Sequence, residues 1–309
     1  MLYEAIFVRW LGCGGLVPSG RRSGGGRALG LRKARLLRWA RAMAVIFYCG
    51  SCIGGGVAAA EPEPWSLWDA HAPANDALID HAAWQGFLDK YLVAHPDSVN
   101  RVAYKRVTAA DRGQLRGYLE MLSLIDPREF AKAEQLPYWI NLYNALTVDV
   151  VLRYPGKSSI LRMGRSLLPF GPWDDELLSV AGQPITLNDI EHRILRPIWQ
   201  DHRIHYAVNC ASISCPSLAA SAYTRTNTED LLASGERAYI NHPRGVRFGP
   251  DGGLTVSRIY EWYGEDFAAD AAGLLAYLSR HHRSAAKALS AYSGRIDYAY
   301  DWSLNQLED

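Results

Sequence analysis

The spacing of hydrophobic residues predicts a chain rich in helices. Apolar positions recur at helical intervals over residues 76–95 and 108–125, and the second segment opens with a capping-box pattern formed by Thr108 and Asp111. A third segment, residues 137–154, is apolar on almost every side, so we expect it to form a helix at the centre of the fold.

Shorter patterns predict strands and further helices in the rest of the chain. Residues 203–209 alternate between apolar and polar positions, which is the period of a half-buried strand. The other expected elements are a hairpin over 177–185, a helix capped by Thr186 and running to Pro197, a helix over 228–240, a hairpin across 250–253, helices over 258–292 and a strand over 296–300. Because helices dominate and strands come in short pairs, we expect an α+β fold. It would be a mostly helical single domain around a small, mainly antiparallel sheet.

The first sixty residues differ in composition from the rest. Nine Lys or Arg residues and one acid are followed by an uncharged stretch over residues 42–60, which ends in three alanines before Glu61-Pro62-Glu63-Pro64. A basic region, an apolar region and a small-residue site in that order are typical of a signal peptide. We therefore expect cleavage after residue 60, leaving one globular domain over 61–309 in the periplasm or outside the cell. A retained membrane anchor and a lipid-anchored Cys52 are the alternatives, and the true start codon stays open.

Removal of this leader changes the charge and the cysteine count. Residues 61–309 hold 24 Lys and Arg against 31 Asp and Glu, and their only cysteines are Cys210 and Cys215. An acidic domain is poorly suited to a phosphate backbone, so we expect no nucleic-acid partner, and no membrane insertion once the leader is cleaved. No Gly-rich phosphate loop follows a predicted strand, and we expect neither a cofactor nor a bound metal. The expected partner is a small-molecule or peptide substrate of unknown identity.

Polar residues inside strongly apolar segments are the candidates for a functional site, because a buried amide or imidazole is costly unless a partner satisfies it. They are Asn141 and Asn144 in the central helix; Asn188, Glu191 and His192 in the next helix; His205 and Asn209 in the alternating segment; and Cys210 directly after it. Each also has a structural interpretation: the histidines as hydrogen-bonded core side chains, and the asparagines as partners of backbone groups.

Cys210 is the candidate nucleophile, because a cysteine at the end of a predicted strand is exposed enough to react. A thiolate needs an imidazole base and a group that orients it, and His192, His205 and Glu191 are the candidates. Backbone N–H groups of residues 211–214 are the expected oxyanion donors. Strict strand alternation turns His205 away from Cys210 unless a turn begins at Asn209 or Cys210, so the identity of the base stays open.

The Cys210–Cys215 pair allows other interpretations. In an oxidising compartment the two cysteines could form a structural disulfide or cycle between disulfide and dithiol. Zinc is a weaker alternative, because the spacing exceeds the usual gap of two to four residues between ligand cysteines.

Five sequence blocks resemble one known family. They are YWINLYNALT (138–147), TLNDIEHRILRP (186–197), RIHYAVNCASISCPSL (203–218), SRIYEWYGEDF (257–267) and YDWSLN (300–305). In this order, and over about Glu134 to Asn305, they resemble the family catalogued as domain of unknown function 547. The resemblance implies an exported bacterial member and a thiol enzyme that is papain-like or transglutaminase-like, in a permuted order because the histidines precede the cysteine.

Carried over residue by residue, the resemblance places the family's Glu and His on Glu191 and His192, a second His on His205 and the Cys on Cys210. Some relatives have Ser at the position of Cys215, which favours Cys210 as the functional thiol. We therefore expect a cysteine-dependent hydrolase or acyl-transfer enzyme acting on an amide or ester. The alternatives are a non-catalytic periplasmic binding or scaffold module rich in aromatic residues, and a thiol/disulfide redox protein. The substrate and the oligomeric state stay open.

Overall fold

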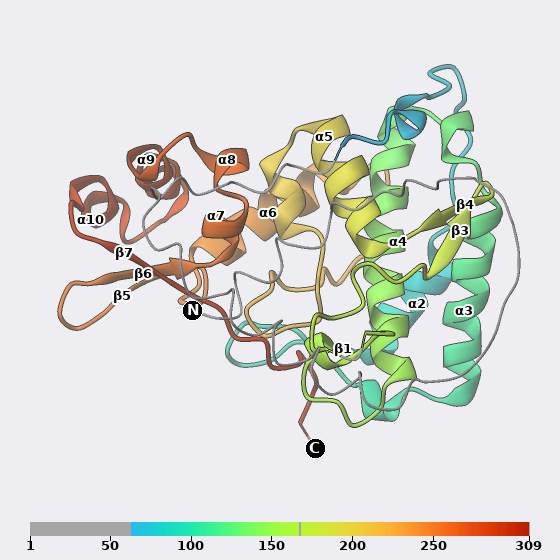
Figure 1. Cartoon of the computed structure of the whole chain (residues 1–309), viewed down its shortest axis with the longest axis horizontal. Helices are drawn as coiled ribbons and strands as arrows, with labels where there is room; N and C mark the ends of the chain where they lie inside the picture. The colour runs from blue at the N-terminus through green and yellow to red at the C-terminus, as the bar shows by residue number, and fades with distance from the viewer. Residues whose placement is uncertain (1–62, 167, 309) are drawn as a thin grey trace, which may run out of the picture. The chain divides into compact units, whose positions relative to one another are not determined.

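One long helix, α4 (Lys132–Arg153), lies at the centre of the fold. The computed structural model describes residues 63–166 and 168–308, and the predicted signal peptide lies outside these residues. Almost every side chain of α4 from Glu134 to Leu152 is buried, which confirms the central helix predicted from its all-round apolar sequence. Helix α3 (Ala109–Leu124) lies beside α4 (Figure 1).

The N-terminal elements pack against α3 and α4. They are η1 (Ser66–Asp69), α2 (Ala82–Tyr91), β1 (Leu92–Val93), β2 (Arg101–Val102), η2 (Tyr104–Arg106) and η3 (Pro127–Glu129). Helix α3 begins as predicted, because the Asp111 N–H donates to Thr108 Oγ1 at 3.1 Å. Helix α2 is shorter than the predicted segment 76–95, and Leu78 before it is 68% exposed rather than packed in the core.

The predicted hairpin at 177–185 consists of β3 (Leu178–Val180) and β4 (Gln183–Ile185), paired antiparallel. Its turn has positive φ at both Ala181 and Gly182, the backbone that a tight two-residue hairpin requires. The next helix is not an ordinary α-helix: η5 (Asp189–Leu195) is a π-helix and continues into α5 (Arg196–Trp199). A π-helix carries i→i+5 hydrogen bonds and is rare, often marking a functional site.

The strand predicted over 203–209 is wrong. Residues His202–Tyr206 form the 3-10 helix η6, in which the Ile204 N–H donates to Asp201 O and the Ala207 N–H to Ile204 O. The alternating pattern is misleading because Ile204 to Asn209 are all buried, the polar positions included. Alternation of apolar and polar residues indicates a strand only when one face of the segment is exposed to solvent, and this segment has no exposed face.

The C-terminal part builds a second hydrophobic cluster. Its elements are α6 (Thr228–Ile240), β5 (Val246–Phe248), β6 (Leu254–Ser257), α7 (Ile259–Trp262), α8 (Gly264–Phe267), α9 (Ala271–His281), α10 (Ala286–Ala291) and β7 (Ile296–Ala299). These positions confirm the predicted helices, the hairpin and the final strand. Strand β6 pairs antiparallel with β5 and parallel with β7 (Figure 1).

Taken over the described residues, the fold is a mostly helical α+β arrangement with small sheets of two or three strands, as predicted. A first hydrophobic cluster surrounds α4 and a second surrounds β5–β7. Tyr206 belongs to the second cluster and Ala207 to the first, so the chain passes between the clusters just before Cys210.

Candidate functional site

Cys210 lies in a loop that follows η6 and is fixed to α4 by an asparagine side chain. Asn144 Nδ2 donates to Ala207 O at 3.0 Å, and Asn144 Oδ1 accepts from the Asn209 N–H at 2.8 Å. All of these atoms are buried, where an amide without partners would be costly. Asn144 therefore holds the backbone immediately before Cys210.

Asn209 shapes the turn that follows. Its Oδ1 accepts from the Ala211 N–H at 2.9 Å and from Asn305 Nδ2 at 3.2 Å, and its Nδ2 donates to Pro216 O at 2.7 Å. Ala211 has φ of 59°, a left-handed backbone that residues with a Cβ rarely adopt. The hydrogen bonds of Asn209 stabilise this strained turn and so set the direction of the Cys210 side chain.

The Cys210 sulfur has hydroxyl groups as its side-chain oxygen partners. Ser212 Oγ and Tyr300 Oη each lie 3.1 Å from Cys210 Sγ, and the two hydroxyl oxygens are 2.9 Å apart. No imidazole nitrogen is among the hydrogen-bond partners of this sulfur within the described part of the chain.

These contacts change the acidity of the thiol. Burial acts to raise the pKa of Cys210, but hydrogen bonds from Cys215, from the Ser212 and Tyr300 hydroxyls and from the Ser212 N–H outweigh it and lower the pKa to about 7. Hydrogen bonds that favour the charged form stabilise a thiolate in this way. Cys210 as a residue is half-buried, whereas Cys215 is buried.

The second cysteine, Cys215, differs from Cys210 in the direction of its pKa shift. Its sulfur accepts from the Cys210 N–H at 3.0 Å and lies 3.7 Å from Val208 O. Burial, and then the neighbouring Cys210, raise the pKa of Cys215 well above its usual range. Both cysteines are free thiols, and only Cys210 is acidified.

Glu191 and His205 come together from different elements. Glu191 Oε1 lies 3.8 Å from His205 Nδ1, which is a close contact rather than a hydrogen bond, and Glu191 Oε2 accepts from the Tyr143 hydroxyl at 2.9 Å. His205 Nε2 lies 2.6 Å from Asp266 Oδ2, to which Arg196 Nε also donates at 2.6 Å. The imidazole is thus placed between two carboxylates.

His192 lies on the π-helix near the same cluster but in a different position. Its Nδ1 is 3.4 Å from Arg196 Nη1, and its ring centre is 5.7 Å from that of Tyr263. His205 stacks on the same Tyr263 ring at 4.3 Å. Tyr263 therefore lies against both candidate histidines.

Two phenols, the buried Tyr143 and the partly buried Tyr263, respond electrostatically to both the sulfur and Glu191. Burial raises the pKa of Tyr143 well above its usual range, and the negative charges of Glu191 and Cys210 raise it further. Burial and Glu191 likewise raise the pKa of Tyr263, against the opposing charge of Arg196. Because each phenol responds to both groups, Tyr143 and Tyr263 lie within electrostatic range of the thiol and of the carboxylate.

The predicted oxyanion donors are mostly engaged elsewhere, which corrects that expectation. The Ala211 N–H donates to Asn209 Oδ1, the Ile213 N–H to Ser303 O and the Ser214 N–H to Asp301 O. Of these groups, the Ser212 N–H acts on the sulfur, because it helps to lower the pKa of Cys210. The donors next to the reacting atom are therefore the hydroxyls of Ser212 and Tyr300, with the Ser212 N–H.

Two predicted supporting residues lie apart from the thiol. Asn141 satisfies the backbone of Tyr223, donating to its O at 2.7 Å and accepting from its N at 3.0 Å. Asn188 donates to Asp174 Oδ1 at 2.7 Å in the loop before β3. Both therefore hold neighbouring segments, and neither is among the hydrogen-bond partners of Cys210.

Comparison with known proteins gives a family for the central part of the chain. Residues 127–240 match the family model described as "Protein of unknown function, DUF547". The match supports the DUF547 family. No curated protein and no solved structure matches the chain.

The DUF547 segment includes Glu191, His205 and Cys210, but the site continues beyond it. Asp266, which binds His205, and Tyr300, which contacts the sulfur, both lie outside residues 127–240. Sequence reasoning did not single out either residue, nor Ser212, Tyr143 or Tyr263. The available signal was their place in the motif blocks, because Asp266 lies in SRIYEWYGEDF and Tyr300 begins YDWSLN.

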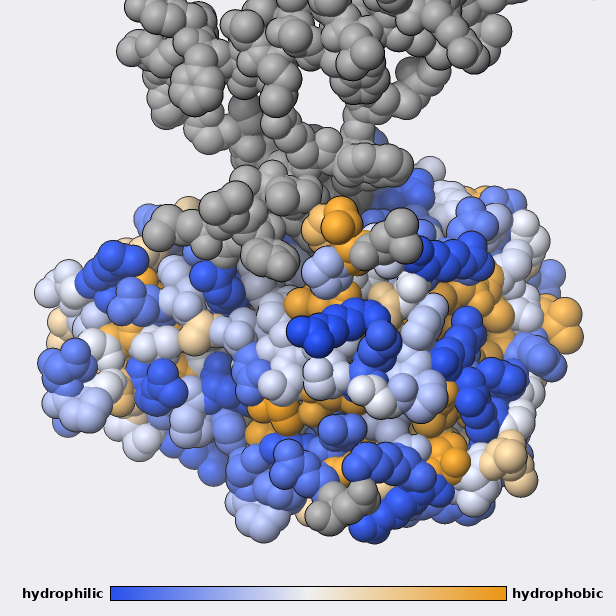
Figure 2. Space-filling model, turned by 60° about the horizontal axis from the view of Figure 1, so that its bottom comes forward, coloured by the Kyte–Doolittle hydropathy of each residue, from blue (hydrophilic) through white to orange (hydrophobic). Residues whose placement is uncertain are grey.

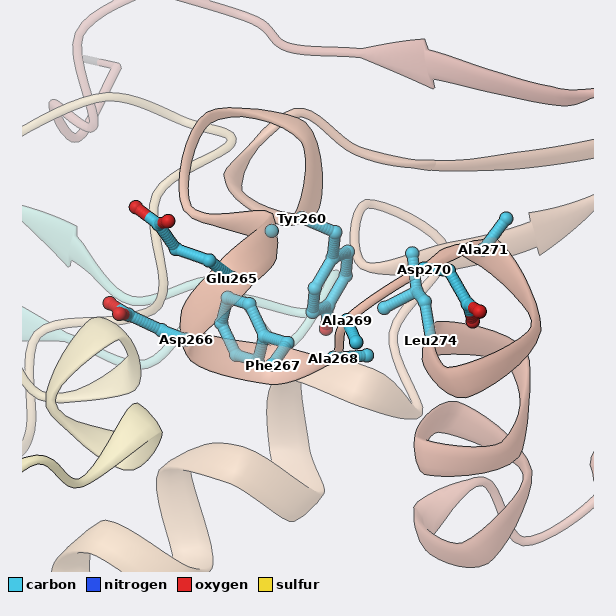
Figure 3. A pocket seen from close by; sticks show the side chains of 10 residues that line it. Tyr260, Glu265, Asp266, Phe267, Ala268, Ala269, Asp270, Ala271 and Leu274 are labelled. Carbon is cyan, nitrogen blue, oxygen red and sulfur yellow. The ribbon is translucent and has the colours of Figure 1, made fainter. Parts of the chain in front are cut away.

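A hollow of about 600 Å³ lies beside α8 and the start of α9 (Figure 3). Tyr260, Phe267 and Leu274 form its apolar lining, and Glu265, Asp266 and Asp270 contribute carboxylates. Asp266 and Phe267 both contact His205 and belong to this lining, and the Asp266 carboxylate is occupied by His205 and Arg196. The hollow therefore adjoins the histidine cluster rather than the sulfur.

Two further properties concern residues 63–166 and 168–308. Within them, no three His, Cys, Asp or Glu side chains are grouped so as to hold a metal ion. None of their helices combines the length and apolar character needed to cross a bilayer. The face in Figure 2 is largely hydrophilic, with hydrophobic residues in separate patches.

Proposed function

We propose that this chain is a cysteine-dependent hydrolase or acyl-transfer enzyme that acts on an amide or ester, with Cys210 as the nucleophile. The observation that carries the proposal is the environment of the half-buried Cys210 thiol. Burial acts to raise its pKa, but hydrogen bonds with Cys215, Ser212 and Tyr300 lower the pKa to about 7. A thiol of this kind is substantially ionised at neutral pH, and the thiolate is the reactive form.

In this proposal the thiolate attacks the carbonyl carbon and forms a C–S bond. The hydroxyls of Ser212 and Tyr300, both 3.1 Å from the sulfur, stabilise the charge that develops on the carbonyl oxygen. The leaving amine or alcohol takes a proton from the imidazolium of His205, which Asp266 and Glu191 hold in place. Water, or a second acceptor, then gives a proton to the neutral His205 ring and attacks the thioester. The C–S bond breaks, the acyl group leaves, and the thiolate and the protonated His205 are restored.

Site-specific alkylation of the full chain tests this proposal. In the unmodified chain, with peptide mass spectrometry reporting Cys210 separately from Cys215, we expect iodoacetamide to label Cys210 at a rate that rises with pH to a plateau, with a midpoint near 7. The matched control is the same protein unfolded in urea, where the midpoint returns to that of a free cysteine, about 8.5. Equal labelling rates for folded and unfolded protein at about pH 6 would falsify the nucleophile assignment.

A second function is favoured by the opposite acidity of the two thiols. Dithiol redox proteins combine an accessible, acidic thiol with a less acidic partner, and Cys210 and Cys215 show this asymmetry. In a redox protein the two thiols would lose two hydrogens to an oxidant and form a disulfide. Oxidation by diamide, followed by intact mass measurement, distinguishes the two: rapid and reversible loss of two hydrogens favours redox cycling, whereas retained thiols favour the hydrolase.

We also propose that residues 1–60 direct export to the periplasm or outside the cell. The support is the order of charge and hydropathy in that segment, nine basic residues followed by an uncharged stretch. N-terminal sequencing of the mature protein from a secretory host tests it. A chain beginning at Glu61 agrees with the proposal, and a chain that keeps its leader contradicts it.

A further inference from the structure

Three aromatic side chains form a continuous surface that reaches the Cys210 sulfur. Tyr300 contacts the sulfur through its hydroxyl, and its ring centre lies 4.8 Å from that of Trp262 and 4.7 Å from that of Trp302. Trp262 and Trp302 are 5.6 Å apart. We call Trp262, Tyr300 and Trp302 the aromatic surface.

This surface differs from the aromatic core in its exposure. Trp68, Trp84 and Trp139 are at most 1% exposed and fill the hydrophobic cluster around α4. In contrast, Trp262 is 38% exposed, while Tyr300 and Trp302 are half-buried. The aromatic surface therefore connects a solvent-exposed side chain, Trp262, with Tyr300, whose hydroxyl contacts the sulfur.

The three rings are also tilted relative to one another. Their interplanar angles are 55° for Trp262 and Tyr300, 52° for Tyr300 and Trp302, and 33° for Trp262 and Trp302. Rings at such angles present both faces and edges to the same neighbouring space. A flat aromatic ring of a ligand can stack offset on one of these rings and make an edge-to-face contact with another, which are the arrangements that aromatic pairs prefer. An aliphatic ring of similar size gains only the burial of its apolar surface.

We propose that the aromatic surface is a substrate subsite, and that the amide or ester cleaved at Cys210 carries an aromatic ring within a few bonds of its carbonyl group. This inference rests on the proposed function of Cys210 and adds the substrate class. Trp262 is the specificity-determining residue, because it is the most exposed member of the surface and its ring contacts both of the others.

The experiment compares alkylation of Cys210 by three related reagents: iodoacetamide, its N-benzyl derivative and its N-cyclohexylmethyl derivative. The protein is the full chain carrying Cys215→Ala, at a pH above the midpoint of Cys210. All three reagents react with the same thiolate, so the ratio of their rates does not depend on how much thiolate is present. We expect the benzyl reagent to react about 3- to 10-fold faster than the cyclohexylmethyl reagent, the range that one aromatic contact provides.

Variants of Trp262 connect this preference to the surface. Trp262→Leu is expected to abolish the benzyl preference, and Trp262→Phe to retain most of it. Trp199→Leu is the matched control, because Trp199 packs against Lys132 on another part of the fold and should leave the preference unchanged. Equal rates for the benzyl and cyclohexylmethyl reagents, or a preference that survives Trp262→Leu, would overturn the inference.

Failure of this inference can be told apart from failure of the proposed function. If Cys210 is reactive towards iodoacetamide but shows no benzyl preference, the nucleophile stands and the subsite is rejected. If Cys210 has ordinary reactivity but the benzyl preference depends on Trp262, the aromatic surface stands as a binding site and the catalytic proposal is rejected.

Discussion

At the scale of single residues, the acidity of Cys210 depends on neutral hydroxyl groups rather than on an adjacent imidazole. Tyr300 and Ser212 contribute hydrogen bonds at 3.1 Å each, while the imidazole of His205 lies between Glu191 and Asp266. Each hydroxyl contact stabilises the thiolate directly. Removing one of them should therefore change the titration of the thiol.

Tyr300→Phe is expected to raise the pKa of Cys210. A hydrogen bond to a charged group contributes about 1.5–3 kcal/mol, which corresponds to about one to two pKa units. The alkylation midpoint should move upward by that amount, and the rate at about pH 6 should fall roughly 10-fold or more. Tyr298→Phe is the control, since Tyr298 lies on the same chain segment without contacting the sulfur; a similar shift in both variants would contradict the assigned contact.

Asn141 and Asn144 offer a second residue-level test, because they lie three positions apart on α4 and make equivalent backbone contacts. Asn144 holds Ala207 and Asn209, whereas Asn141 holds Tyr223. Replacing either with Ala leaves buried backbone groups without partners, at a cost of about 1–3 kcal/mol in unfolding free energy.

Only Asn144→Ala is expected to change the pH profile of Cys210 alkylation, since only Asn144 fixes the loop before the thiol. Urea denaturation measures the stability of both variants, and iodoacetamide labelling measures the thiol. An altered labelling profile in Asn141→Ala would show that the Cys210 loop responds to any loss of stability of the fold, and not specifically to the loss of the Asn144 hydrogen bonds.

At the scale of elements, the π-helix η5 positions Glu191 relative to the other residues of the site. Thr186 and Asp189 form a reciprocal cap at its start: the Asp189 N–H donates to Thr186 Oγ1 and the Thr186 N–H donates to Asp189 Oδ2, both at 3.0 Å. Glu191 lies in the same first turn and contacts Tyr143 on α4. The cap thus anchors the element that carries the carboxylate.

Thr186→Ala is expected to lower the unfolding free energy by about 1 kcal/mol, the usual contribution of such a cap. For a chain of this size the melting temperature should fall by about 2–4 °C, measured by circular dichroism. The control is Ser293→Ala at an exposed position, which should leave the melting temperature unchanged. An unchanged melting temperature in Thr186→Ala would mean that tertiary packing alone fixes η5.

At the scale of the whole molecule, most helices could be predicted from the sequence, but only some of the residues that form the site could be. The capping box at Thr108 and the apolar sequence of α4 identified their helices, because those signals are local. The failure at 203–209 has a physical reason, since a fully buried segment gives no informative alternation. Glu191, His205 and Cys210 were found from their chemistry, but Asp266 and Tyr300 approach through tertiary folding from distant positions that no local pattern connects.

A buried carboxylate links several C-terminal elements and makes stability depend on pH. Glu236 accepts from His202 Nε2 at 2.9 Å and from the Tyr277 hydroxyl at 2.8 Å, and lies 3.2 Å from His281 Nδ1. Burial acts to raise the pKa of Glu236, but these partners outweigh it and lower the pKa. A carboxyl whose pKa is lowered by folding stabilises the fold above its unfolded-state pKa, and this contribution is lost as pH falls through the folded-state value.

Glu236→Gln is therefore expected to reduce the unfolding free energy at neutral pH and to weaken its decline between about pH 5 and 3. Urea denaturation across this range gives both quantities. Glu120→Gln, at an exposed position, is the control and should follow the unmodified chain. A Glu236→Gln curve parallel to that of the unmodified chain at every pH would reject the assignment.

The distance along the chain between the parts of the site has a consequence for its biogenesis. Cys210 takes its hydroxyl partner from Tyr300, and Asn305 binds the turn through the Ala211 O and Asn209 Oδ1 atoms. A nascent polypeptide that has not yet reached residue 305 therefore lacks part of the surroundings that acidify Cys210, namely the Tyr300 hydroxyl and the Asn305 contacts. Until the last segment folds into place, the sulfur should behave more like an ordinary cysteine thiol, which is mostly protonated at neutral pH and less reactive than the thiolate.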